Sequence, residues 1–180
     1  MKKKVSNGFT LVEVLIALAV FAIFTLLVNS IFFNILRSAA KQEALKEVRQ
    51  SGDLALTVLD KKLREATLIE SPSTCPFTDE SALSIRNLDG STTVLDLEAT
   101  IDGVTRLRSV GGSPEVTEYL TSTLTSVNTL NFTCDASGSH PLITIYLNIE
   151  HKNNVEGSTR GDETASVDFQ TSTYLRNAAL

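Results

Sequence analysis

Residues 1–36 read MKKKVSNGFTLVEVLIALAVFAIFTLLVNSIFFNIL, and this stretch decides how the chain is organised. Three lysines precede an apolar run that continues to Leu36, with Glu13 as its one charged residue. A helix rises about 1.5 Å per residue, so a run of this length crosses the hydrocarbon core of a bilayer. Lysines on its N-terminal side predict that the N-terminus stays in the cytoplasm. The sequence therefore predicts one membrane-spanning helix over residues 9–36.

Two other interpretations of this stretch compete. A secretory signal peptide would be cut after small residues such as Ser38 and Ala40, but its apolar core has only about 7–15 residues, and this run is far longer. A plain single-pass anchor explains the length of the run. It does not explain Glu13, which lies five residues after Gly8 at the start of the run. An ionisable group at that depth is costly and calls for a partner.

Cleavage of the chain between Gly8 and Phe9 would supply such a partner. The cut would create a cationic α-amine on Phe9, about one helical turn away from Glu13. In an array of parallel helices, the carboxylate of Glu13 would meet the Phe9 amine of a neighbouring chain. The two charges would neutralise each other and fix the axial register between the subunits. These residues therefore favour assembly through the apolar helix.

The motif Gly8-Phe9-Thr10-Leu11-Val12-Glu13 resembles the processing motif of type IV pilins and type II secretion pseudopilins. The resemblance implies that a prepilin peptidase removes the leader, residues 1–8, that Phe9 is then N-methylated, and that Glu13 acts in assembly. It implies other pilin subunits and an inner-membrane assembly platform as partners. It also implies storage in the inner membrane with the head outside, followed by a cell-surface or periplasmic filament.

Two further features bear on the branch of this family. Major pilins often carry a helix-bending proline in the apolar segment, whereas this chain has Asn29 and Ser30 there and no proline before Pro72. Residues 46–69 and 167–177 resemble segments of minor pilins and J-type pseudopilins. The resemblance therefore implies a minor pilin or pseudopilin of a pilus, secretion or DNA-uptake filament, and leaves the system and the stoichiometry open.

The helix is predicted to continue beyond the membrane as an amphipathic second half over residues 37–70. Apolar residues recur there at intervals of three and four and form one stripe, while charged residues occupy the other sides. The helix is predicted to run from Phe9 to Ile69, because the sequence Ser71-Pro72-Ser73 stops it. The stripe comprises Leu45, Val48, Gly52, Ala55, Leu56, Leu59, Leu63 and Ala66.

Residues 71–180 are richer in β-branched residues and turn signals, and they are predicted to form a β-rich globular head. An antiparallel sheet would cover the apolar stripe of the helix, which gives an α+β, pilin-like layout. The dipeptide Asp102-Gly103 is a hairpin signal, and 111–114 and 152–163 are predicted loops. Alternation of apolar and polar residues predicts strands at Ser81–Leu88, Ser91–Ile101, Val104–Val110, Thr121–Cys134, Leu142–Glu150 and Ser166–Leu175.

The two cysteines, Cys75 and Cys134, both follow the apolar segment. If this part of the chain is exported, an oxidising environment favours a disulfide between them, and two free thiols are the alternative in a reducing compartment. The chain-entropy model gives such a disulfide about 4 kcal/mol of stabilisation. Two cysteines without CxxC spacing do not indicate a metal site.

Charge and motif content argue against other functions. The net charge is −5, and without the three N-terminal lysines 13 basic side chains stand against 21 acidic ones. Nucleic acid is therefore not an expected partner, and a local basic patch around Arg106 and Arg108 is the one alternative left open. Phosphate-loop, GxSxG and HExxH motifs are missing from the sequence, and neither an enzymatic activity nor a cofactor is predicted.

A few polar residues leave alternatives open. The acidic pairs Asp79-Glu80 and Asp162-Glu163 fit solvated surface positions, with a Ca²⁺ site as the alternative. His140 and His151 fit exposed positions in turns. A filament-tip adhesin or ligand-binding module is the second hypothesis for function, and an exposed aromatic patch or a deep pocket in the head would support it. A membrane-anchored enzyme, the third, would need a cluster of titratable residues.

Overall fold

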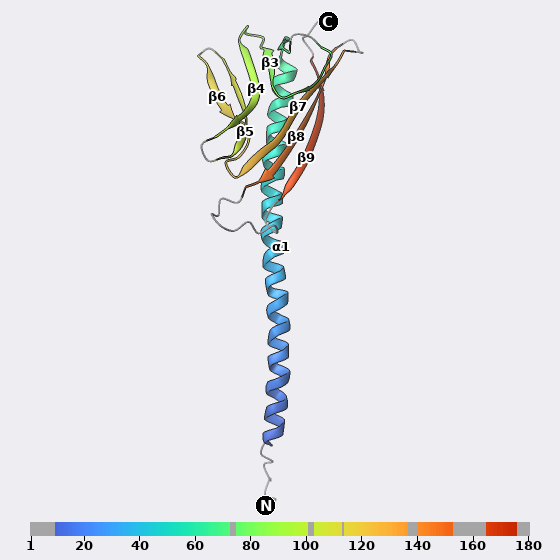
Figure 1. Cartoon of the computed structure of the whole chain (residues 1–180). Helices are drawn as coiled ribbons and strands as arrows, with labels where there is room; N and C mark the ends of the chain where they lie inside the picture. Colours follow the sequence, from blue (N-terminus) through green and yellow to red (C-terminus); the bar gives the residue numbers. More distant parts are fainter. Residues whose placement is uncertain are drawn as a thin grey trace, which may run out of the picture. The chain divides into compact units, whose positions relative to one another are not determined.

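The computed structural model of this chain describes residues 10–72, 75–100, 103–112, 114–136, 140–152 and 165–175. The chain divides into two compact units, Met1–Ala40 and Lys41–Leu180, here called the N-terminal and C-terminal units. Helix α1 (Leu11–Glu65) contributes to both units, and antiparallel strands follow it (Figure 1). The order of these elements confirms the predicted α+β, pilin-like architecture.

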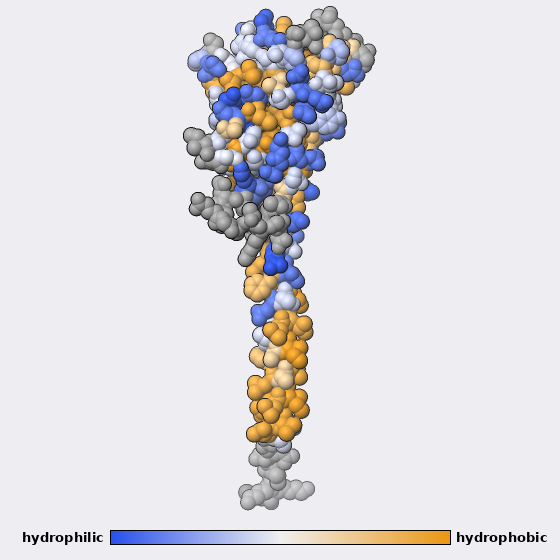
Figure 2. Space-filling view, in the orientation of Figure 1, coloured by the Kyte–Doolittle hydropathy of each residue, from blue (hydrophilic) through white to orange (hydrophobic). Residues whose placement is uncertain are grey.

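In the N-terminal unit, α1 carries exposed apolar side chains on all sides. Every large apolar side chain from Leu11 to Leu36 is exposed, and Figure 2 shows the lower part of the helix mostly in hydrophobic colours. The helix is long and apolar enough, by length and composition, to cross a membrane. The hydroxyls of Thr25 and Ser30 donate hydrogen bonds to backbone carbonyls of the preceding turn. These hydroxyls are therefore satisfied within the helix and need no polar neighbour.

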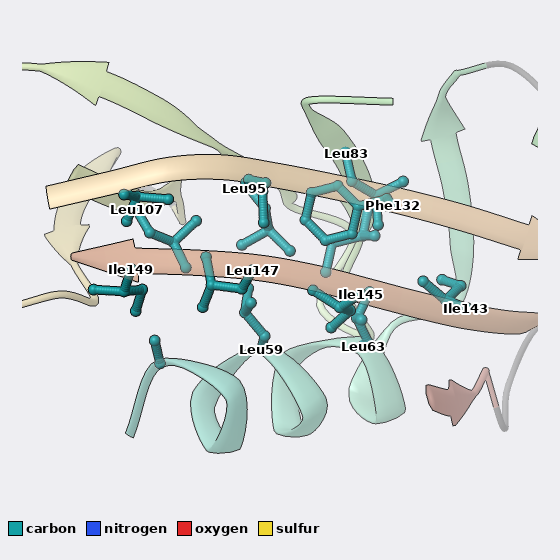
Figure 3. Packing of buried hydrophobic residues seen from close by; sticks show 14 of the residues in the cluster. Leu59, Leu63, Leu83, Leu95, Leu107, Phe132, Ile143, Ile145, Leu147 and Ile149 are labelled. Carbon is teal, nitrogen blue, oxygen red and sulfur yellow. The ribbon is translucent and has the colours of Figure 1, made fainter. Parts of the chain in front are cut away.

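In the C-terminal unit, α1 buries the predicted apolar stripe. Val48, Ala55, Leu59 and Leu63 have no exposed surface, and Gly52 is buried with them. Figure 3 shows how the stripe packs. Leu59 and Leu63 lie against residues of strands β7 (Thr125–Asp135) and β8 (Leu142–His151), with side chains of the other sheet beyond. Burial of each aliphatic side chain contributes about 1.5–3 kcal/mol to the stability of the fold, so this stripe stabilises the packing of the helix on the sheets.

The helix ends at Glu65, earlier than the predicted Ile69. The next residues form strand β1 (Leu68–Ser71), in which Leu68 pairs with Arg86 and Ile69 with Ile85. Both partners belong to strand β3 (Leu83–Arg86). The pairing is non-local, and it outweighs the helical periodicity that continues in the sequence up to Ile69.

The strands form two antiparallel sheets in place of the single predicted sheet. The first has the order β1-β3-β4-β5-β6 and the second the order β2-β7-β8-β9. Figure 1 labels strands β3 to β9 of these sheets. Besides β1, two four-residue strands lie outside the predicted set, β2 (Phe77–Glu80) and β6 (Val116–Tyr119). Each of the other six strands overlaps a predicted strand. They are β3, β4 (Thr92–Ala99), β5 (Thr105–Gly111), β7 (Thr125–Asp135), β8 (Leu142–His151) and β9 (Ser166–Tyr174).

Gly52 brings β9 close to the helix. A Cβ atom at this position would lie 2.2 Å from the ring of Phe169, a β9 residue that packs against the core. The absence of a side chain therefore leaves room for the ring. The cost in helix propensity, about 1 kcal/mol relative to alanine, accompanies this close approach.

Candidate functional site: the N-terminal processing and assembly segment

Glu13, the predicted assembly residue, lies in the first turn of α1 and caps it. The backbone N–H and the hydroxyl of Thr10 donate to Oε2 of Glu13 at 2.8 and 2.9 Å, and the N–H of Glu13 donates to Oγ1 of Thr10 at 3.3 Å. This reciprocal arrangement is a capping box, which satisfies backbone N–H groups that the first turn leaves unpaired. The Thr-x-x-Glu pattern is a sequence signal for it, and the sequence-based interpretation omits this role.

The capping box leaves part of the Glu13 carboxylate available. Both hydrogen bonds from Thr10 end on Oε2, and within the described residues Oε1 accepts none. A carboxylate oxygen with free lone pairs can accept a hydrogen bond from a cationic donor on another chain. Gly8 and Phe9, the predicted cleavage site, lie outside the described residues.

Cys75 and Cys134 form a disulfide with their Cα atoms 5.5 Å apart. Cys134 is a buried residue of β7, and its neighbour across the ladder is Phe77 of β2. Cys75 lies just before β2, in the segment that follows β1. The disulfide therefore ties the connection between the two sheets to β7, a central strand of the second sheet.

Arg106 and Arg108, at which the sequence left a basic patch open, contact neighbours on the first sheet. Arg108 contacts the carboxylate of Asp96 through Nε and Nη2, at 2.6 and 3.0 Å, and Glu98 through Nη1, at 2.7 Å. Tyr119 donates to Glu98, and the Arg106 guanidinium lies 5.2 Å from the centroid of the Tyr119 ring. Arg108 is therefore paired with two carboxylates on the sheet, whereas Arg106 contacts the ring of Tyr119.

The same contacts shift two ionisations. The hydrogen bond to Asp96 is the main cause that raises the pKa of Arg108 above its ordinary value. The hydrogen bond to Glu98 raises the pKa of Tyr119, because it requires the phenol to keep its proton. Both groups therefore hold their protons more firmly in the folded chain. The stabilisation from Tyr119 is present below its unfolded pKa and is lost as the pH rises through the folded value.

Arg108→Ala is expected to lower the free energy of unfolding by about 1–2 kcal/mol, because Asp96 and Glu98 lose their cation. The three side chains are 23 to 34% exposed, which keeps the loss well below that of a fully buried pair. Arg64→Ala is the matched control and is expected to cost less, since its ion pair with Asp60 is more exposed to solvent. Urea unfolding of the full chain in detergent micelles measures both, and equal losses would contradict a stabilising network.

The two histidines and the two acidic pairs that the sequence singled out belong to different segments of the chain. His140 is exposed, and His151 is half-buried at the end of β8. Asp79 and Glu80 belong to β2, and Asp162-Glu163 lies outside the described residues. Within the described ranges, no group of three or more His, Cys, Asp or Glu side chains could hold a metal ion.

Residues 3–29 match the family model of the prokaryotic N-terminal methylation motif. The match includes the predicted cleavage site and Glu13, and it stops within the apolar segment. No curated protein and no solved structure matches the chain. The motif and the apolar helix are consistent with the type IV pilin and pseudopilin family. They support a pilin-like subunit that is anchored in the membrane and processed by prepilin peptidase.

Proposed function

We propose that this chain is a minor pilin or pseudopilin, a structural subunit of a type IV pilus or of a type II secretion or DNA-uptake filament. One observation carries the proposal: a single helix starts in the methylation motif and ends in the core of a β-rich unit. The side chains of its first half are exposed and apolar, whereas its second half buries a stripe. Such a first half needs a cover of lipid or of other apolar helices.

Processing by the peptidase prepares the helix for assembly. The leader, residues 1–8, carries three lysines that would have to follow the apolar helix into a bundle of helices. Each charge placed in an apolar bundle costs about 2.5–3.5 kcal/mol. Cleavage between Gly8 and Phe9 removes the lysines and leaves one cation, the α-amine of Phe9, which is then N-methylated. An assembly ATPase and an inner-membrane platform move the helix from the membrane into the filament.

Glu13 then pairs with the Phe9 amine of a neighbouring subunit. The support for this pairing is the Oε1 oxygen of Glu13, which accepts no hydrogen bond from the residues that the structure describes. The cap holds the carboxylate at the start of the helix, so the pairing is made at one axial position. Register between subunits therefore follows from one charge pair in an otherwise apolar surface.

The sequence supports the assignment to the minor pilins and pseudopilins over the major pilins. The apolar segment contains no proline, and residues 46–69 and 167–177 resemble minor pilins and J-type pseudopilins. The alternative of a ligand-binding head has less support. Tyr146 and Tyr174 are exposed on one face of the second sheet, but Tyr174 pairs with Leu142. The two rings therefore stand four positions apart along the strands, about 14 Å, and do not form one aromatic patch.

Gly8→Val tests the proposal when the chain is co-expressed with a prepilin peptidase and the other filament subunits. A branched side chain next to the cut bond is expected to block cleavage, so the variant stays at full length in the membrane fraction. Ser6→Val, which alters the leader but not the cut bond, is the matched control and should reach sheared filaments like the unaltered chain. Gly8→Val in filaments at the level of the control would contradict the proposal.

A further inference from the structure

Three of the four strands at the edges of the sheets are short or irregular. β1, β2 and β6 have four residues each. β1 has a register shift between Ile69 and Ser71, and β2 has one between Phe77 and Glu80, where Asp79 has a φ of 56°. Short and bulged edges resist pairing with strands of other chains. These edges are therefore protected.

β9 lacks such protection. Among the described residues it is the outermost strand of the second sheet (Figure 1), and its nine residues include neither proline nor lysine. Its register against β8 is regular from Ser166 to Tyr174. Its one charged side chain, Asp168, accepts a hydrogen bond from Asn148 at 2.6 Å. A long and regular edge of this kind is a template for strand addition.

The ladder with β8 shows which backbone groups of β9 point outward. The N–H of His151 donates to the carbonyl of Ala165, and the N–H of Leu175 donates to that of Pro141, so these are hydrogen-bonded pairs. Along the regular ladder, the odd-numbered residues of β9 bond to β8, and the even-numbered ones turn N–H and C=O toward the free edge. The even-numbered residues are Ser166, Asp168, Gln170, Ser172 and Tyr174, and all are exposed.

The charge of the second sheet indicates what kind of strand fits this edge. Its four strands contain five carboxylates and neither lysine nor arginine. Near the edge, Glu150 and Asp168 accept hydrogen bonds from the neutral amides of Asn128 and Asn148, and no described cation pairs with either carboxylate. A strand with Lys or Arg beside Asp168 would supply a cation to a carboxylate that pairs with none among the described residues.

We propose that β9 is a pairing edge, to which a neighbouring filament subunit adds an extended strand with Lys or Arg on its outer face. The inference rests on the proposed function, because it takes the partner from the filament. Main-chain hydrogen bonds to the even-numbered residues supply the affinity, and Asp168 supplies the preference for a basic strand. The second sheet then continues from one subunit into the next.

Hydrogen exchange of the full chain tests this pairing, with the chain in detergent micelles compared with the chain in purified filaments. The outward amides of Asp168, Gln170 and Ser172 are expected to exchange rapidly in micelles and at least about tenfold more slowly in filaments. The amides of Phe169 and Thr171 bond to β8 and should be slow in both, which makes them the internal control.

Substitutions in β9 test the same edge by another route. Gln170→Pro removes an outward N–H and no bond to β8, so it is expected to lower incorporation into filaments at least about tenfold. Gln170→Ala keeps the N–H and should stay within about threefold of the unaltered chain. Asp168→Lys should lower incorporation like the proline variant, because it repels a basic strand.

Each outcome decides between the two proposals. Unchanged exchange of the outward amides in filaments that contain the chain would overturn the pairing edge and leave the proposed function standing. Slow exchange of these amides already in micelles would overturn it as well, since the edge would then be covered within one chain. Normal incorporation of Asp168→Lys would overturn the basic partner. A chain absent from filaments would overturn the proposed function and, with it, the partner. The exchange comparison uses the unaltered chain, so a folding defect in Gln170→Pro does not affect it.

Discussion

Glu13→Gln is expected to leave cleavage between Gly8 and Phe9 intact and to lower incorporation into filaments on the order of 100-fold. Glutamine keeps an acceptor for Thr10 and hence the capping box, but it carries no charge for the Phe9 amine of the next subunit. A cation left unpaired in the apolar bundle costs about 2.5–3.5 kcal/mol. Quantitative mass spectrometry of sheared filaments measures the incorporated fraction.

Thr10→Ala separates the cap of the helix from the charge at Glu13. It removes the hydroxyl of the capping box and keeps the carboxylate, so it costs about 0.5–2 kcal/mol of helix stability and leaves the pairing possible. We expect Thr10→Ala to incorporate better than Glu13→Gln. The reverse order would mean that Glu13 acts through the cap, and it would contradict the pairing between subunits.

Removal of the disulfide is the second large change. Replacing both Cys75 and Cys134 by alanine is expected to lower the free energy of unfolding by about 4 kcal/mol, because the bond closes a long loop in the unfolded chain. The two residues are 59 positions apart, and Cys134 is buried among apolar neighbours. Urea unfolding of the full chain in micelles, followed by the circular dichroism of the strands, measures the difference.

A reductant supplies the control for the disulfide. It should destabilise the unaltered chain by a similar amount and leave the double alanine variant unchanged. A loss below about 1 kcal/mol in the double variant would contradict the expected effect of loop closure. Equal sensitivity of both chains to the reductant would mean that it acts elsewhere in the protein.

The features that local sequence determines were predictable. The apolar stripe from Val48 to Leu63 follows from a period of three to four residues, and it is buried as expected. Strands β7 and β8 alternate apolar and polar residues along most of their length, and they lie within about four residues of their predicted positions. The motif from Gly8 to Glu13 depends on neighbouring residues only, and the match to the methylation motif covers it.

The features that depend on distant partners were not predictable. β1 forms because Leu68 and Ile69 pair with β3, whereas the sequence around them continues a helical pattern. β6 is a short strand of exposed residues, so it has no apolar alternation that could mark it. The division into two sheets depends on which strands pair. The environment of Arg108 depends on the register between β4 and β5.

The cap at Glu13 was missed for a different reason. Its signal is local, a threonine followed three residues later by a glutamate before an apolar run. The same carboxylate also matches an assembly motif. Because that motif already explained Glu13, its role in capping the helix was not considered. The structure shows the cap directly, and within the described residues the other carboxylate oxygen of Glu13 accepts no hydrogen bond.

The mature N-terminus is the measurement that tests the central claim most directly. The full chain is expressed with and without a prepilin peptidase, and its N-terminal peptide is identified by mass spectrometry. We predict a chain that begins at Phe9 and carries an N-methyl group when the peptidase is present, and one that keeps its leader when it is absent. A chain that stays whole with the peptidase, or is cut near Ala40, would contradict a filament subunit.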